Sequence, residues 1–261
     1  MTPAFAATLA LLGFAGAFVS GLVGVGGAIV MIPLLYYMPP LLGVGSLPMS
    51  EVSGVTMVEV LVASAVGTWI HGRHAAVHRG LALTGGVAMA TASLAGAIAS
   101  SQLSARALLT VFAVMATVAL PLLAVRPVAG DESAPPADAA ASRALAVVTL
   151  TLIGAASGLV GAGGAFLTVP VMIALLRLPV RLAIGTSLAV TGMSALTGVL
   201  GKALTAQIPL GPAGVVMLGS LLGARLGSRI SRRVPVRVLR LVLAGLIALV
   251  AIRVWWDVLA R

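Results

Sequence analysis

The sequence has no cysteine, few charged residues and few aromatic residues. Without cysteine, the chain forms no disulfide framework and gives no information on the redox state of its compartment. Only 8% of its residues are charged, against about 25% in soluble domains, so water is not its main solvent. Hydrophobic residues make up 60% of the chain and the mean hydropathy is +1.17, which indicates a membrane protein.

The net charge of +10 does not indicate a nucleic-acid partner. The basic residues lie mostly in short gaps between apolar segments, where signals of membrane topology are found, and aromatic residues do not alternate with them. The first residues carry no basic segment, so we expect no cleaved signal peptide. The chain also has no Walker-type phosphate-binding motif, which argues against ATP hydrolysis.

A glycine-rich segment occurs twice. Residues 20–33 return 137 residues later as residues 157–170, and nine of the fourteen positions are identical. Gly54 and Gly67 likewise correspond to Gly185 and Gly198 at a second, common offset. A glycine cluster repeated in corresponding apolar segments is typical of a duplicated transporter with interrupted helices.

The pattern of apolar segments predicts an all-α, polytopic membrane protein made of two repeats. A helical span needs about 20 apolar residues. We predict an N-terminal repeat at 1–125, a linker at 126–143 and a C-terminal repeat at 144–261, each repeat with one broken segment and about three transmembrane helices. The apolar segments are Ala4–Met38, Val52–Ile70, Gly80–Ser100, Ala107–Val125, Ala144–Leu176, Leu182–Leu200, Leu210–Arg225 and Val238–Val254.

The two broken segments either cross the membrane once or re-enter as hairpins of two half-helices. Single crossings divide the basic residues seven against eight between the two sides, which gives no bias. Hairpins leave four on one side, namely Arg106, Lys202, Arg253 and Arg261. The other side then holds eleven, namely Arg73, Arg79, Arg126, Arg143, Arg177, Arg181, Arg229, Arg232, Arg233, Arg237 and Arg240. Because basic residues gather on the cytoplasmic side, the count favours hairpins and hence two inverted repeats.

The glycine motifs predict a binding site for a small anion near the membrane midplane. Glycine accepts positive φ, so a Gly-x-Gly-Gly turn lets the chain reverse. The half-helices that begin near Gly27 and Gly164 would then present free N–H groups and the positive end of the helix dipole. Close helix packing through small residues is the alternative interpretation. A dinucleotide fingerprint does not fit, because Ile29 stands where its third glycine belongs.

These paired Ser-Gly-x-x-Gly-x-Gly-Gly segments, with Ala183-Ile-Gly-Thr-Ser-Leu-Ala189 after the second, resemble the TauE/SafE sulfite exporter family, also called the toluene-sulfonate uptake permease family. The resemblance covers almost the entire chain. It implies a multi-pass carrier of the bacterial inner membrane, an exporter of sulfite or small organosulfur anions such as sulfonates and sulfoacetate. The anion-contacting positions that it implies are Gly24, Gly26, Gly27, Gly161, Gly163 and Gly164.

The resemblance also implies hydroxyl donors near the anion. The Gly185-Thr186-Ser187 turn after the second hairpin would supply Thr186 and Ser187, whereas in the first repeat only Thr56 keeps a hydroxyl. Glu59 stands where the second repeat has Val190. Intramembrane acids are costly and usually functional, so we expect Glu59 to couple transport to protons or to sense substrate charge. A neutral, hydrogen-bonded core acid, or an acid that faces a water-filled vestibule, is the alternative.

Other chemistry finds little support. Lys202 ends an apolar segment, and we interpret it as an interfacial anchor. His71, His74 and His78 have helical spacing but share a basic gap between spans, so we predict no metal site and no cofactor. An intramembrane metalloprotease would need a His-Glu-x-x-His motif, which is absent, and we predict no enzyme activity. An anion-selective channel remains an alternative to a carrier, and the oligomeric state stays open between monomer and homodimer.

Overall fold

The protein is a bundle of helices of unequal length. The computed structural model describes residues 1–23, 28–71, 77–124, 139–231, 234 and 236–260. Among these residues there is no strand, which confirms the predicted all-α class. The helices are α1 (Pro3–Val23), α2 (Ala28–Leu41), α3 (Met49–His71), α4 (Arg79–Ala99), the 3-10 helix η1 (Ser100–Gln102), α5 (Ala105–Ala124), α6 (Ala139–Val160), α7 (Ala165–Ala174), α8 (Val180–Leu204), α9 (Leu210–Ser231) and α10 (Val236–Ala260).

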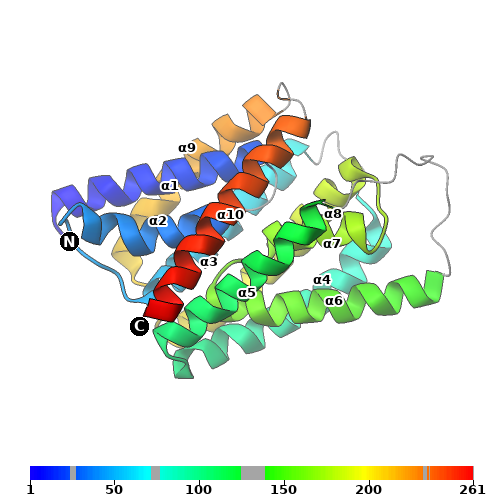
Figure 1. Cartoon of the computed structure of the whole chain (residues 1–261), viewed down its shortest axis with the longest axis horizontal. Helices are drawn as coiled ribbons and strands as arrows, with labels where there is room; N and C mark the ends of the chain where they lie inside the picture. Colours follow the sequence, from blue (N-terminus) through cyan, green and yellow to red (C-terminus); the bar gives the residue numbers. More distant parts are fainter. Residues whose placement is uncertain (24–27, 72–76, 125–138, 232–233, 235, 261) are drawn as a thin grey trace.

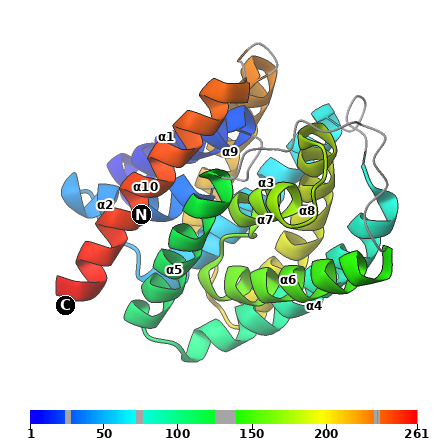
Figure 2. The same cartoon turned by 45° about the vertical axis from the view of Figure 1, so that its right-hand side comes forward.

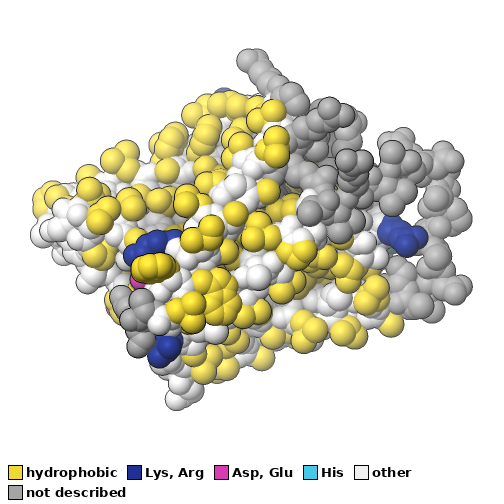
Figure 3. All heavy atoms as spheres, viewed as in Figure 1, with side chains coloured by type: hydrophobic (Ala, Val, Ile, Leu, Met, Phe, Trp, Pro, Cys, Tyr) yellow, Lys and Arg dark blue, Asp and Glu magenta, His cyan; other side chains and the backbone are white. Residues whose placement is uncertain are grey.

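The helices present apolar faces to their surroundings. Six of the described helices, namely α1, α3, α4, α5, α8 and α9, are long and apolar enough to cross a membrane. Leucines on the outside of the bundle are largely uncovered, including Leu152 of α6 and Leu218 of α9. Figure 3 shows a face covered with hydrophobic side chains, on which the few basic side chains in view lie toward the ends of the helices. So large an apolar surface fits a lipid environment.

The two repeats interlock by exchanging helices. The first helix of each repeat packs most extensively against the fourth helix of the other, so α1 lies along α9 and α6 lies along α4 (Figures 1 and 2). The central pair, α3 and α8, also joins the repeats. In the same way α7 packs on α5 and α2 packs on α10. Each contact therefore has a counterpart in the other repeat, as a duplicated chain with internal two-fold pseudosymmetry requires.

The corresponding helices α3 and α8 run antiparallel. Lys202 near the end of α8 donates to Ser53 near the start of α3. Further along, a Cβ on Gly198 would lie 2.9 Å from the sulfur of Met57, and a Cβ on Gly192 would lie 3.5 Å from Ser64 Oγ. Repeats related by an axis along the membrane normal would keep corresponding spans parallel. The antiparallel pair therefore supports the inverted orientation, which otherwise stays a prediction.

The bundle has two ends with different charge. The connections 100–104 and 205–209 lie at one end, where Ser100 Oγ donates to Gln207 Oε1, and both chain termini lie toward it (Figure 1). We name it the arginine-poor end, because Arg106 and Arg253 are its described arginines. The opposite, arginine-rich end holds the starts of α4 and α8, which are joined by a bond of 3.0 Å from His78 N–H to Thr186 Oγ1.

The second broken segment is a hairpin with unequal arms. α6 runs parallel to α4, since Gly154 lies against Met89 and Gly158 against Ser93. Residues 161–164 then reverse the chain into the ten-residue helix α7, which leads back to the start of α8 at the arginine-rich end. The prediction of two half-helices is correct for the second arm only, because α6 is 22 residues long. α6 also begins at Ala139, inside the predicted linker, where three consecutive alanines favour a helix.

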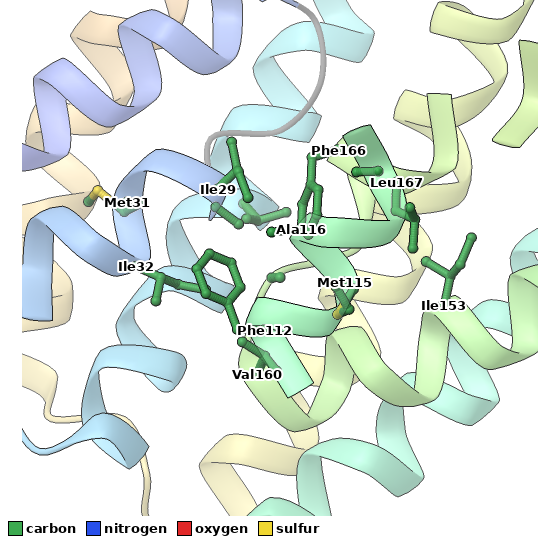
Figure 4. Packing of buried hydrophobic residues seen from close by; sticks show 14 of the residues in the cluster. Ile29, Met31, Ile32, Phe112, Met115, Ala116, Ile153, Val160, Phe166 and Leu167 are labelled. Atoms are coloured by element: carbon green, nitrogen blue, oxygen red, sulfur yellow. The ribbon is translucent and has the colours of Figure 1, made fainter. Parts of the chain in front are cut away.

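An apolar core fixes the start of α7. Phe166, the second residue of α7, packs edge-on against Phe112 of α5 with ring centroids 6.2 Å apart. Figure 4 shows Ile29 of α2 and Phe166 on either side of Ala116, with Phe112 below them. Ile29 and Phe166 hold corresponding positions in the two repeats. The first turns of the two short helices therefore meet around the same segment of α5.

Candidate functional site: the N-terminus of α7

The turn before α7 depends on glycine. Gly161, Gly163 and Gly164 have φ values of +81°, +59° and +75°, in the left-handed region that side chains rarely adopt. They are also packed too tightly for a side chain, because a Cβ on Gly161 would overlap the carbonyl of Ser53 and one on Gly164 would lie 2.8 Å from Ile153. The sequence motif therefore specifies both the reversal of the chain and its close contact with α3.

The turn lies at mid-height in the bundle. A Cβ on Gly163 would meet Val60, in the middle of α3, and Thr191, in the middle of α8. A Cβ on Gly164 would meet Met89, in the middle of α4. All the side chains and backbone from residue 161 to residue 170 are buried. If α3, α4 and α8 span the bilayer, the turn is therefore close to its midplane.

The turn leaves backbone donors unpaired. The N–H groups of Gly161 and Ala162 donate to Ser157 O at 2.8 and 3.0 Å. The next four N–H groups along the chain have no acceptor among the described residues, and Gly164 caps α7 without a side-chain hydrogen bond. These four belong to Gly163, Gly164, Ala165 and Phe166. Buried unpaired N–H groups at a helix N-terminus form a favourable site for an anion.

Two unpaired hydroxyl groups flank the turn. Ser157 Oγ and Thr191 Oγ1 are fully buried and have no partner among the described residues. A Cβ on Gly164 would lie 3.3 Å from Ser157 Cβ, and one on Gly163 would lie 3.4 Å from Thr191 Cγ2. A buried hydroxyl without a partner costs about 1–3 kcal/mol, so its retention points to a ligand or water that supplies the partner.

Further unpaired polar groups belong to α3 and α8, the two helices that touch the turn. Both carboxyl oxygens of Glu59 are fully buried and unpartnered, and Glu59 is adjacent to Val60, which touches the turn. Thr56 Oγ1 on α3 and Ser194 Oγ on α8 are also buried without a partner. We name Thr56, Glu59, Ser157, Thr191 and Ser194 the central polar residues. They include two of the residues expected from the sequence, Thr56 and Glu59.

Thr186 and Ser187 differ from these residues in their surroundings. Both are fully buried, but they belong to helix α8 rather than to a turn. Thr186 Oγ1 accepts the bond from His78 N–H at the arginine-rich end, and Ser187 Oγ donates to Ile184 O at 2.9 Å. Their predicted contact with an anion stays a prediction. Ser157, Thr191 and Ser194 are unpaired hydroxyls that were not predicted from the sequence, although Ser157 opens the second glycine motif.

The first motif cannot be described in the same way. Gly24, Gly26 and Gly27 lie outside the described residues, so their predicted role stays a prediction. The helix that follows, α2, begins at Ala28 and contacts α7.

His71 ends α3 and His78 precedes α4, where its Nδ1 accepts from Leu81 N–H at 3.2 Å. Within the described ranges no group of three metal-binding side chains occurs.

Lys202 contradicts its interpretation as an interfacial anchor. Its side chain is 0% exposed, and its ammonium group has hydrogen-bond partners on α3, η1 and α6 and in the connection after α8. An anchor would extend along the helix to the membrane surface. Lys202 points into the bundle instead, because polar oxygens from distant segments of the chain converge there. The local sequence gives no signal of this convergence.

Comparison with known proteins assigns the chain to a family. Searches among curated proteins and among solved structures gave no match. Residues 9–254 match the model of the family described as Sulfite exporter TauE/SafE, which covers both repeats and nearly the whole chain. The apolar helices, the duplicated glycine motif and this match agree, and the chain belongs to the TauE/SafE family of membrane transporters.

Proposed function

We propose that this protein is a secondary transporter that exports sulfite or a small organosulfur anion such as a sulfonate or sulfoacetate. The observation that carries the proposal is the N-terminus of α7, where four buried N–H groups have no acceptor within the described chain. The unpaired hydroxyls of Ser157 and Thr191 lie beside it. These donors suit an oxyanion, whose several oxygen atoms each accept more than one hydrogen bond.

Electrostatics favours an anion at this position. The N-terminus of a helix carries roughly half a positive charge, and this charge acts strongly where water is excluded. The site therefore needs no basic side chain in direct contact with the ligand. The contact between α2 and α7 supports the further expectation that the corresponding helix start of the first repeat contributes to the same site. A site formed at the repeat interface can be exposed to each side in turn.

Glu59 is the proposed coupling group. An ionised carboxylate one residue from Val60, which touches the turn, would repel an anion, whereas a protonated carboxyl would not. Its two unpaired oxygens leave it free to take up and release a proton as the ligand binds and leaves. We therefore propose that transport of the anion is linked to protonation of Glu59. The arginine-rich end would face the cytoplasm of a bacterial cell, in line with the distribution of basic residues in the sequence.

Flux measurements in proteoliposomes test the proposal. We expect saturable uptake of radiolabelled sulfite that is accelerated by unlabelled sulfite on the opposite side, with competition from sulfonates or sulfoacetate. An imposed pH gradient should change the rate and show the direction of coupling. Flux that neither saturates nor responds to unlabelled sulfite on the opposite side would indicate a channel. Absence of flux for every anion in the panel would refute the assignment of substrate class.

A further inference from the structure

Lys202 is a buried cation near the arginine-poor end, close to the last residue of α8. Its three N–H donors are shared among four oxygens, which lie at 2.6 Å (Ser100 Oγ), 2.7 Å (Ser53 Oγ), 3.0 Å (Gln207 Oε1) and 3.1 Å (Leu159 O) from Nζ. Gln207 Nε2 in turn donates to Ala97 O and Thr205 Oγ1. We name Lys202, Ser53, Ser100 and Gln207, with the carbonyl of Leu159, the Lys202 network.

The Lys202 network contains no counter-charge. Its acceptors are two hydroxyls, one amide oxygen and one backbone carbonyl, and no salt bridge to Lys202 occurs in the described part of the chain. A buried ammonium without a carboxylate is costly, so it must be held by good hydrogen bonds. Neutral oxygens can be exchanged for water at small cost, because a hydrated ammonium regains its lost solvation. These hydrogen bonds are therefore what holds the ammonium in the closed arrangement.

The network lies between the α7 N-terminus and the arginine-poor end. Ser53 is near the start of α3, Ser100 begins η1 and Gln207 lies between α8 and α9, all at the arginine-poor end. Leu159 is two residues before Gly161, and the carbonyl of Ser53 packs against Gly161. Lys202 thus ties the end of α6 to α3, η1 and the connection after α8, directly on the arginine-poor side of the turn.

The repeats differ at this position. The offset that pairs Gly54 with Gly185 and Gly67 with Gly198 pairs Lys202 with His71. The first repeat therefore has an imidazole side chain where the second has an ammonium group on a long, flexible stem. In a duplicated carrier each repeat closes one side of the site. The two repeats therefore differ in residue type at this position.

We propose that Lys202 is the latch of the gate at the arginine-poor end. Its hydrogen bonds to Ser53 and to the carbonyl of Leu159 hold α6 against α3, and this side of the site opens when water replaces these two partners. The inference rests on the proposed function in one respect, namely that the protein alternates between two accessible states. Lys202 acts by holding helices in place and does not contact the anion.

Cysteine labelling tests the latch directly, because the chain has no cysteine of its own. Thr56→Cys places one thiol on α3, one turn from Ser53 toward the middle of the bundle. The rate of its reaction with a membrane-impermeant maleimide is measured from each side, in the absence of any anion, with Lys202 intact and with Lys202→Met. We expect Lys202→Met to accelerate labelling from the arginine-poor side about tenfold, because the closed state then buries oxygen acceptors that have lost their donor.

Arg106→Met is the matched control. Arg106 is an exposed cation at the same end, and its guanidinium donates to Val258 O at 3.0 Å. Arg106→Met removes one positive charge at the same end without touching the Lys202 network, so the labelling rate of Thr56→Cys should not change. Ser100→Ala removes one acceptor and keeps the ammonium, and it should accelerate labelling less than Lys202→Met does. If Lys202→Met does not fold, Ser100→Ala decides the question alone.

Equal labelling rates with the intact Lys202 network and with Lys202→Met or Ser100→Ala would refute the proposal that Lys202 is a latch. A lower affinity for sulfite with unchanged labelling would also overturn it, because Lys202 would then act on the anion. The labelling rates do not depend on transport. Failure of the latch therefore leaves the proposed substrate class standing, and failure of sulfite flux leaves the latch to be judged by labelling alone.

Discussion

Lys202 and Glu59 have opposite surroundings, although both are ionisable side chains that the described structure buries completely. Lys202 has four oxygen acceptors within 3.1 Å, whereas neither carboxyl oxygen of Glu59 has a partner within the described ranges. A fully satisfied buried polar group fixes the segments that supply its partners. An unsatisfied one keeps its bonding capacity for a ligand, a proton or water. The first arrangement suits a structural lock, and the second suits a transport site.

The hydroxyl groups show the same division. Ser53 and Ser100 bond to the ammonium of Lys202, whereas Ser157 and Thr191 beside the α7 N-terminus bond to nothing described. The unpaired hydroxyls lie at mid-height in the bundle, and the paired ones lie near the arginine-poor end. Unmet bonding capacity is thus concentrated where the backbone N–H groups of the turn are also unpaired.

The largest effect is expected at the turn itself. Gly164→Val places a branched side chain at φ +75° and against Ile153, so the first turn of α7 must move. We expect transport to fall by about a hundredfold or more, because binding geometry is lost. Gly245→Val is the control, since nothing lies within 4 Å of a Cβ on Gly245 in α10. Both variants should reach the membrane. Normal flux in Gly164→Val would show that the anion-binding site does not lie at the turn.

A smaller effect is expected at the unpaired hydroxyls. Thr191→Val keeps the shape of the side chain and removes one donor beside Gly163. We expect the KM for sulfite to rise about tenfold, the value of one hydrogen bond to a charged group. The melting temperature should rise at the same time, because an unpaired buried hydroxyl is lost.

Ser187→Ala is the comparison variant for Thr191→Val. The hydroxyl of Ser187 already bonds to Ile184 O, so its loss should leave KM nearly unchanged. A larger change in KM at Ser187 than at Thr191 would contradict the proposal that the unpaired hydroxyls, and not the paired ones, contact the anion. It would instead support the assignment of anion contacts that the family resemblance implies.

The smallest change in structure is Glu59→Gln. The amide has the size of the carboxyl but cannot take up a proton, so proton coupling is lost while the fold is kept. We expect the pH dependence of transport to flatten, with the slope of log rate against pH falling from about one to about zero. Initial rates in proteoliposomes over a range of pH values give the measurement. An unchanged pH profile would mean that Glu59 is a structural acid.

Much of this architecture could be predicted from local features of the sequence. The duplicated glycine motif predicts a chain reversal because positive φ at Gly161, Gly163 and Gly164 is a local backbone property. The apolar segments predict helices because an unpaired backbone is not tolerated in lipid. The length of α6 was not predicted, since the sequence signal for a break gives its position and not how far the preceding helix extends.

The polar contacts could not be predicted in the same way. Lys202 resembles an anchor in its own sequence context, and its partners Ser53 and Ser100 are 149 and 102 residues away. Thr186, Ser187 and Thr191 lie within two turns of one helix, yet only Thr191 is left without a partner. Ser187 is paired within its own helix, whereas the partner of Thr186 comes from the segment before α4.

The sequence by itself determined that this protein lies in lipid, that it is duplicated and where its chain turns. Hydrophobicity and glycine geometry act within short segments, so these features can be predicted locally. The tertiary structure alone decided which buried polar groups are paired and which are not, because hydrogen bonds between side chains require atoms from several helices within about 3 Å of one another. That decision separates the Lys202 network from the central polar residues, and with it the proposed gate from the proposed site.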